Sequence, residues 1–325
     1  MRRLYNIDTL KFLCAVLVVF LHVRTSYQTY ILPLTRCAVP CFLIISGYLI
    51  YTEDRLKMEG HLKKSIYRML RILVWSSLLF AMVKFLFALR SGDFSFLSIM
   101  ALGKFVLFNE NPFGFHLWYI GAYLYTLAIV LFFVKCNRLK YIWWSVPFLL
   151  LLDLCLGKYS LILWHKEFPY IWVRNFLCVG IPYFSIGMVL KQWKWLMQNL
   201  CCLQNLALGG VILFSLTSIV ENRWLLELHA NAVRDHYIST TFLAVSLFLL
   251  FLSLTQHRGN ALSMIGEKES LYIYIFHPLF MVFFSKANQY IPDLWLEIYR
   301  YGAPVIILIA TILLAKSLRI LHIIK

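Results

Sequence analysis

Ten stretches of mainly apolar residues recur along the chain from one end to the other. Each is close to the roughly 20 residues that a helix needs to cross a bilayer. Of the 325 residues, 61% are hydrophobic and only 14% are charged, which leaves too little polar surface for a soluble domain of this length. We therefore predict an all-α, polytopic integral membrane protein with about ten transmembrane helices in one bundle. The predicted spans lie near residues 6–26, 33–51, 69–89, 115–134, 140–156, 170–190, 204–220, 237–255, 269–286 and 302–321.

The chain is predicted to form a single transmembrane domain over residues 1–325, with no soluble domain appended. No linker rich in proline, serine or glycine, low-complexity tract or clear internal repeat interrupts the sequence. The start, MRRLYNIDTLK, imitates a secretory signal, but no cleavage site of small residues follows it, so we expect it to stay with the first span. The segment near 95–108 is compatible with a re-entrant or interfacial piece. The eight cysteines show no metal-ligand spacing, and we expect neither a metal site nor a bound cofactor.

A formal net charge of +16 raises the question of a nucleic-acid partner. The basic residues sit in short clusters between apolar runs, so the expected partners are anionic membrane lipids, and no nucleic acid is expected. If the N-terminus is cytoplasmic, most of the 31 lysines and arginines fall in inner segments. The positive-inside rule then predicts an even number of spans with both termini in the cytoplasm.

The first span contains KFLCAVLVVFLH, an apolar run with an ionisable residue at each end, Lys11 and His22. Eleven residues at about 100° each return to nearly the same helix face and rise roughly 16 Å. One face therefore carries a cation near one membrane surface and an imidazole well towards the other. Asp8 precedes Lys11 by one turn and is placed to pair with it. The alternative is that Lys11 snorkels to the headgroups and His22 marks the outer interface.

Other polar residues also lie within or beside the spans, where a charge at the bilayer centre costs on the order of 2.5–3.5 kcal/mol. Arg68 and Arg71 lie one turn apart in RMLR, as expected for a pair that binds phosphate. The alternative is that they only contribute to the excess of basic residues found on the cytoplasmic side of membrane proteins. His277 lies in mid-span beside Pro278, where a structural, hydrogen-bonded histidine is the alternative to a functional one. Ser46 lies beside Gly47 in VPCFLIISGYLI, where small residues let a neighbouring helix approach closely. The remaining candidates are Arg36 before that stretch, His116, Trp118 and Tyr119 in FHLWYI, and Arg174 in WVRNFLCVGIPYFSIG. For FHLWYI, an aromatic belt at the outer interface is the alternative.

Taken in order, these stretches resemble acyltransferase family 3, a family of integral-membrane acyltransferases that includes bacterial enzymes acetylating surface polysaccharides. The resemblance rests on NIDTLKFLCAVLVVFLH, VPCFLIISGYLI, RMLR, FHLWYI, RNFLCVGIPYFSIG and SLYIYIFHP, and it covers nearly the whole chain. The first-span signature of that family is a basic residue, ten intervening residues and a histidine. Lys11 stands where arginine is commoner, which keeps the charge but loses the forked donors.

The resemblance implies acetyl transfer from cytoplasmic acetyl-CoA, as a substrate, to a hydroxyl of a glycan or lipid-linked sugar at the outer face of a bacterial inner membrane. For this reaction we predict a catalytic group of His22, His116 and Tyr119, and a donor-binding group of Lys11, Arg68 and Arg71. Supporting or substrate-positioning roles would fall to Asp8, Arg36, Ser46, Trp118, Arg174 and His277. His22 would either remove the acceptor proton or carry the acetyl group itself, and both routes stay open.

Other functions fit part of the pattern. A bundle with intramembrane histidines and cations also suits a proton-coupled transporter of a small substrate, although we see no paired inverted repeat. The acyl group could equally be succinyl or another short chain. A purely structural membrane protein would keep Lys11, Arg36, Lys84 and His277 in the bilayer at a cost and without a function. Acceptor specificity is expected in the outer loops near residues 90–114, 157–170 and 221–236, and the oligomeric state stays open.

Overall fold

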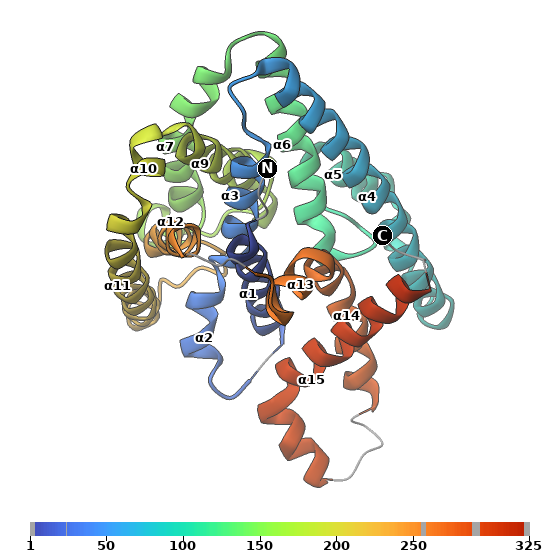
Figure 1. Ribbon diagram of the computed structural model, residues 1–325. Helices are drawn as coiled ribbons and strands as arrows, with labels where there is room; N and C mark the ends of the chain where they lie inside the picture. Colours follow the sequence, from blue (N-terminus) through green and yellow to red (C-terminus); the bar gives the residue numbers. More distant parts are fainter. Residues whose placement is uncertain (1–3, 24, 255–257, 288–292, 322–325) are drawn as a thin grey trace. The chain divides into compact units, whose positions relative to one another are not determined.

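The computed structural model describes residues 4–23, 25–254, 258–287 and 293–321, and the regular structure of these residues is helical, with no β-strand (Figure 1). This confirms the prediction of an all-α, polytopic membrane protein. Elements η1 to η3 are single turns of 3-10 helix, and η4 is a π-helix. In chain order the elements are α1 (Tyr5–His22), α2 (Gln28–Thr35), α3 (Ala38–Ile50), α4 (Arg55–Ser91), η1 (Ser95–Leu97), α5 (Ile99–Phe108), η2 (Phe115–Leu117), α6 (Trp118–Lys135), α7 (Leu139–Leu156), α8 (Ser160–Trp164), η3 (Tyr170–Trp172), η4 (Phe176–Gly180), α9 (Ile181–Gln192), α10 (Lys194–Gln198), α11 (Leu200–Glu227), α12 (Ile238–Ser253), α13 (Ala261–Lys268), α14 (Ser270–Ala287) and α15 (Asp293–Ile320).

Eight helical segments of the described residues are long and apolar enough to cross a membrane, and each matches one of the ten predicted spans. The other two predicted spans coincide with shorter apolar helices, Phe176–Gln192 and Ile238–Ser253. The first of these starts later than predicted because the Asn175 side chain accepts hydrogen bonds from the N–H groups of Leu177 and Cys178 and so caps it. The segment near 95–108 holds α5, whose 10 residues span about 15 Å and are too short to cross.

Helix α4 is longer than the span predicted for it. It runs for 37 residues, about 55 Å, whereas the hydrocarbon core is about 30 Å thick. It starts where the Asp54 side chain accepts from the Lys57 N–H, and it ends at Gly92, whose φ of 75° suits a residue without a side chain. Lys84, near the far end, donates to the Pro112 carbonyl at 2.8 Å. The basic first turns of α4 therefore lie beyond its apolar part. Lys84, which lies within the apolar part, has the Pro112 carbonyl as its partner.

The chain divides into two compact units. Unit 1 comprises Met1–Phe42, Asn199–Trp224 and Tyr237–Lys325, and unit 2 comprises Leu43–Gln198 and Leu225–His236. Two of the four boundaries fall within α3 and α11, and the other two lie between helices. Each unit combines segments that are distant in the sequence. The single domain expected from the sequence stays a prediction.

In unit 1, α1 packs against α2, α12, α13, α14 and α15. Helix α13 approaches α1 so closely that a Cβ at Gly266 would lie 1.8 Å from the Asp8 carbonyl oxygen. Small residues allow such contacts between membrane helices, so the missing side chain at Gly266 sets this distance. One apolar cluster joins α1, α14 and α15, and its buried members are Ala15, Val19, Val23, Ile273, Ala303 and Ile307.

An ion pair with a buried carboxylate lies at the junction between α13 and α14. Glu269 is only 2% exposed, and its carboxylate lies 2.6 Å from the Arg319 guanidinium of α15. Burial raises the pKa of the Glu269 carboxyl by more than the charge of Arg319 lowers it. Glu269 therefore holds a proton more readily in the folded chain than in the unfolded one.

In unit 2, α6 packs against α4, α7 and η4, and α7 packs against α9. Helices α3 and α9 cross where both carry a glycine. A Cβ at Gly47 would lie 1.9 Å from the Phe184 carbonyl oxygen, and a Cβ at Gly187 would lie 2.0 Å from the Ile44 carbonyl oxygen. The close helix approach predicted from Ser46 and Gly47 is therefore confirmed.

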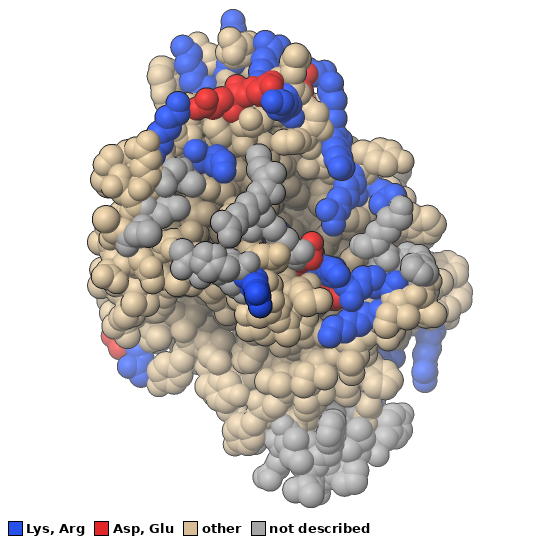
Figure 2. Space-filling model, in the orientation of Figure 1, with Lys and Arg blue, Asp and Glu red and all other residues tan. Residues whose placement is uncertain are grey.

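The predicted inner segments of unit 2 converge at one end. Arg55 donates to the Lys135 carbonyl at 2.6 Å, and Lys194 pairs with Glu53 at 3.3 Å. The start of α4, the end of α6 and the start of α10 therefore lie together. Figure 2 shows charged side chains gathered beside the start of α4, at the top of the view.

Gly187→Ala is expected to destabilise unit 2 by about 1–3 kcal/mol, because the added methyl group collides with the Ile44 carbonyl unless a helix moves. Gly60→Ala is the matched control: Gly60 lies on α4 with nothing within 4 Å of an added Cβ, and alanine should stabilise the helix by up to about 1 kcal/mol. Thermal unfolding of the detergent-solubilised protein, followed by tryptophan fluorescence, measures both changes. Equal melting temperatures for the two variants would contradict the close crossing of α3 and α9.

Glu269→Gln is expected to weaken the dependence of stability on acid pH. The raised pKa of Glu269 gives a stabilisation that is fully present below the unfolded pKa of about 4.3 and is lost as the pH rises through the higher folded pKa. The melting temperature of the variant should therefore fall less than that of the wild type as the pH rises from about 4 to about 6. The exposed Glu227 provides the control variant, Glu227→Gln, which should keep the wild-type profile. A wild-type profile in Glu269→Gln would exclude this assignment.

Candidate functional site

The residues predicted for the site divide between the two units. Unit 1 holds Asp8, Lys11, His22, Arg36 and His277. Unit 2 holds Ser46, Arg68, Arg71, His116, Trp118, Tyr119 and Arg174. Within each unit the structure brings some of these residues into contact and adds partners that the sequence did not indicate.

The first turns of α1 carry an ion pair. Lys11 Nζ lies 2.9 Å from Asp8 Oδ1, with the carboxylate buried and the lysine half-buried. The pairing predicted from the spacing of three residues is therefore confirmed. Gly266 of α13 packs against the Asp8 backbone. This contact fixes the position of the first turns of α1, where the ion pair lies. An ammonium group has three donors, so Asp8 engages one of them and a ligand can use the others.

His22, the last residue of α1, meets His277 of α14. Their rings stack with centroids 5.2 Å apart and planes inclined by 23°. His277 is fully buried, and His22 is half-buried. Two histidines identified separately in the sequence, near opposite ends of the chain, thus form one pair in unit 1.

Pro278 explains how the His277 ring is held. Proline has no N–H, so the Tyr274 carbonyl, one turn earlier, loses its helical donor. His277 bonds to this same turn: Nδ1 lies 3.2 Å from the Ile273 carbonyl oxygen, and a second hydrogen bond involves the Tyr274 backbone. Because a carbonyl only accepts, Nδ1 carries the proton and Nε2 is the basic nitrogen of the neutral ring. The turn before Pro278 therefore fixes the tautomer of the histidine that stacks on His22.

In unit 2, Tyr119 stacks on Tyr123, one turn later on α6, with ring centroids 6.1 Å apart. Tyr123 forms a hydrogen bond with Ser46 of α3 and lies within electrostatic reach of Arg68 of α4. Two predicted site residues, Tyr119 and Ser46, thus contact one tyrosine that the sequence analysis missed. Its spacing of four residues from Tyr119, which places both on one face of α6, is the signal that could have found it.

Arg68 and Arg71 lie one turn apart on α4, and both side chains are exposed. Glu59, the nearest acidic residue on this helix, pairs with Arg55 and Lys63 instead. In the part of the chain that the structure describes, neither Arg68 nor Arg71 forms an ion pair. Their forked donors therefore remain accessible to an anionic ligand.

His116 is buried in η2, the single turn that leads into α6. Its ring lies 4.5 Å from that of Phe80 on α4, edge to face at 70°. Trp118 is also buried. The burial of both rings disfavours the aromatic-belt alternative, in which they would face lipid.

Arg174 lies in an aromatic enclosure. Its guanidinium carbon is 4.2 Å from the Phe115 ring centroid, 4.6 Å from that of Trp118 and 5.1 Å from that of Tyr170. Its Nε faces Asp235 Oδ2 at 3.3 Å. Cation–π contacts and this ion pair fix the orientation of the guanidinium group. Trp118 and Arg174, predicted from different motifs, are therefore neighbours.

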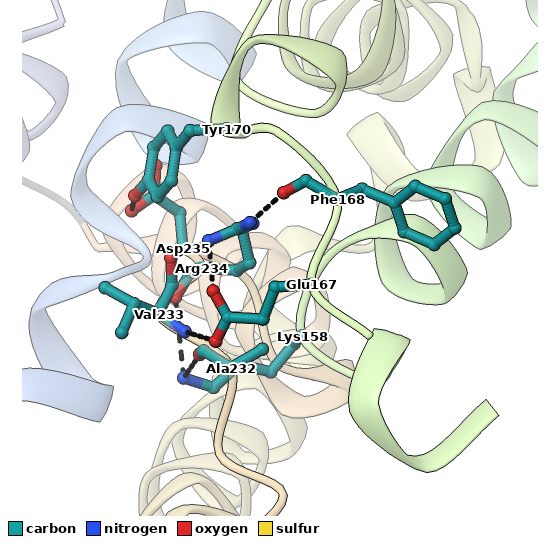
Figure 3. A network of polar contacts seen from close by, with 8 residues as sticks. All are labelled: Lys158, Glu167, Phe168, Tyr170, Ala232, Val233, Arg234 and Asp235. Carbon is teal, nitrogen blue, oxygen red and sulfur yellow. Dashed lines mark hydrogen bonds and ion pairs between the residues drawn. The ribbon is translucent and has the colours of Figure 1, made fainter. Parts of the chain in front are cut away.

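A network of polar contacts joins the segments 158–170 and 232–235 beside this enclosure (Figure 3). Arg234 pairs with Glu167 at 3.2 Å, and Tyr170 donates to Asp235. Lys158 donates to a backbone carbonyl of the 232–235 segment at 2.9 Å. The sequence analysis predicted outer loops near residues 157–170 and 221–236. It did not predict the contacts between them, because interacting residues in loops follow no regular spacing. The labelled members are Lys158, Glu167, Phe168, Tyr170, Ala232, Val233, Arg234 and Asp235.

His236, the residue after this network, pairs with Asp153 at the end of α7. The Nδ1 and Oδ2 atoms are 2.7 Å apart, and both side chains are buried. Since the carboxylate accepts, Nδ1 donates, and Nε2 is the basic nitrogen of the neutral ring. The Tyr183 ring lies edge-on to this imidazole, 5.5 Å away. Asp153 was recognisable as an ionisable residue at the end of a span, but its partner in the loop was not.

A family model described as an acyltransferase domain matches residues 4–315, nearly the whole chain. No curated protein and no solved structure matches the chain. The matched range contains all of the predicted site residues in both units.

Asp235→Asn is expected to lower the free energy of unfolding by about 3 kcal/mol, because it leaves the buried Arg174 guanidinium without its carboxylate. Asp93→Asn is the control in the same unit: Asp93 is exposed and accepts from the Ser95 N–H, and asparagine can replace it there for less than about 1 kcal/mol. Thermal and denaturant unfolding in detergent measure both. A loss in Asp235→Asn no larger than in the control would show that the ion pair does not hold this part of unit 2.

Proposed function

Because the chain belongs to acyltransferase family 3, we propose that this multi-pass membrane protein transfers an acetyl group from cytoplasmic acetyl-CoA to a hydroxyl of an extracytoplasmic or lipid-linked glycan. The family match supports acyl transfer in general, and the acetyl donor and glycan acceptor are the proposal. The observation that carries it is the stacked pair of His22 and His277. Histidine is the commonest general acid or base, and here two of them meet among apolar helices.

The proposed reaction forms an ester bond and breaks a thioester bond. The acceptor hydroxyl oxygen attacks the thioester carbonyl carbon, His22 accepts the hydroxyl proton, and CoA leaves as a thiolate that takes up that proton. His277 holds the His22 ring by stacking on it. In the second route, His22 first takes the acetyl group and releases CoA, and the acceptor hydroxyl then attacks the acetyl-histidine. Both routes give an acetyl ester and free CoA.

Basic residues are proposed to bind the donor. In unit 1, Lys11 precedes His22 by about 16 Å along one face of α1, a distance that an extended pantetheine arm can cover. In unit 2, the exposed Arg68 and Arg71 offer forked donors suited to the nucleotide phosphates. Asp8 positions Lys11 through the ion pair.

Polar and aromatic residues are proposed to take the remaining roles. His116 and Tyr119 act on the acceptor side, with Trp118 and Arg174 in support. Ser46, through Tyr123, and Arg36, half-buried at the end of α2, have supporting roles.

The proposed setting is a bacterial inner membrane, with both termini in the cytoplasm. The convergence of the basic segments around Arg55, Lys135 and Lys194 at one end of unit 2 supports this orientation, since positive loops stay in the cytoplasm. Acetyl-CoA would then reach the protein from that end, and the glycan from the other.

His22→Ala is expected to lower acetyl transfer by about 100-fold or more, because general acid–base catalysis contributes about 10²–10⁴-fold. Membranes that contain the protein are incubated with radiolabelled acetyl-CoA, and the labelled surface glycan is isolated and identified by mass spectrometry. His61→Ala is the control, since His61 is exposed near the start of α4 and takes no part in the proposed site. It should keep the wild-type rate.

Unchanged glycan acetylation in His22→Ala would contradict the acetyltransferase proposal. Movement of a small substrate across the membrane, with no label in any glycan, would favour the proton-coupled transporter. Preferential labelling from succinyl-CoA would keep the enzyme and change its acyl group.

A further inference from the structure

We propose that Arg174 binds an oxyanion of the acceptor, a carboxylate or a phosphate group, through the terminal nitrogens of its guanidinium group. This inference rests on the proposed function and names the chemistry of the acceptor. It makes the acceptor an acidic sugar or a sugar phosphate rather than a neutral sugar.

Two buried arginines of unit 2 contact the same ring, that of Tyr170, but their donors are satisfied differently. The side chains of Arg234 and Arg174 are 7% and 8% exposed. Arg234 donates to Glu167 and to two backbone carbonyls, as Figure 3 shows. Arg174 donates no hydrogen bond to any residue that the structure describes, and its polar contact is the ion pair of Nε with Asp235. In both arginines Nε forms no hydrogen bond. The difference lies in the terminal nitrogens, which donate to the framework in Arg234 and to no described residue in Arg174.

The unused donors of Arg174 define what can bind. A guanidinium group has five N–H donors in one plane, and a buried donor without an acceptor costs free energy. Asp235 lies 3.3 Å from Nε, which still forms no hydrogen bond, and it also accepts from Tyr170. The terminal nitrogens of Arg174 donate to no acceptor among the described residues. A carboxylate or a phosphate presents two oxygens that match this fork.

The aromatic rings around Arg174 indicate that the oxyanion is carried by a sugar. Trp118 is buried, whereas Phe115 is 63% exposed although its ring lies only 4.2 Å from the guanidinium carbon. An exposed aromatic face beside a guanidinium group with unused donors offers apolar surface for a sugar ring whose charged group reaches Arg174.

The position of Arg174 fits an acceptor that arrives from outside the cell. Phe115 precedes α6, and Asp235 precedes α12. Both neighbours lie in or beside segments that the charge pattern places on the outer side.

The test measures thermal stabilisation of the full chain by small probes, in a non-ionic detergent free of sugar and phosphate. The probes are glucuronate, glucose 1-phosphate, glycerol 3-phosphate as a lipid-headgroup phosphate, and glucose, all at matched ionic strength. A ligand that binds the folded chain alone raises its melting temperature. Glucuronate, glucose 1-phosphate or both should stabilise the wild type more than glucose does. Arg174→Gln should need about tenfold more of the same probe for the same shift.

Two further variants complete the test. Arg174→Lys keeps the positive charge but removes the paired guanidinium donors, so it should also weaken probe binding. It replaces Arg174→Gln in the test if that variant does not fold. Arg223→Gln is the matched control, because Arg223 is exposed and also lies over a tyrosine ring, that of Tyr30, at 5.4 Å. It should bind the probes as the wild type does.

The proposal would be overturned if glucose stabilised the protein as much as glucuronate and glucose 1-phosphate do, or if no probe stabilised it. It would also be overturned if glycerol 3-phosphate stabilised the protein as much as glucose 1-phosphate while glucuronate had no effect. Binding of the probes to Arg174→Gln as tight as to the wild type would overturn it as well. Glucuronate alone would assign a carboxylate, and glucose 1-phosphate alone a sugar phosphate. No acetyl transfer is needed, so this result is independent of the His22→Ala experiment.

Discussion

A charge that enters the apolar part of a membrane protein needs a partner, because the hydrocarbon interior contains no water to solvate it. The structure meets this requirement locally within each unit. Lys11 pairs with Asp8 on its own helix, Lys84 donates to a backbone carbonyl, and Arg174 faces Asp235 from a loop. A breach of such a pair leaves an unpaired charge in a medium of low dielectric constant, which costs more than the pair itself contributes. These partners therefore determine which loops lie against which helices, and the candidate site inherits its geometry from them.

Close helix approach is the second determinant, and it coincides with the polar residues. In lipid, helices associate through packing rather than through the hydrophobic effect, so glycines at crossings have a large influence. Gly47 follows Ser46 at the crossing of α3 and α9, and Gly266 packs on the backbone of Asp8. Two of the candidates, Ser46 and Asp8, thus lie at the tightest helix contacts, where the backbone is least free to move.

What could be predicted from the sequence is what depends on local properties. Span positions follow from apolar length, so eight of the ten predicted spans match long apolar helices. The start of η4 and α9 depends on the Asn175 cap, which a hydropathy pattern does not register. The pairing of Asp8 with Lys11 was predictable because both lie on one helix. The partners of Asp153 and Glu167 were not, because they lie in a loop where no period relates one residue to another.

The stacked histidines come from the first helix and from one of the last. A contact between such distant parts of a chain forms late, because almost the whole polypeptide must be synthesised before its two halves can meet. Until α14 joins α1, His22 stands without the ring that holds it. On the proposed function, acyl transfer therefore begins only after α14 has been synthesised. A chain shortened before α14 lacks His277 and stays inactive.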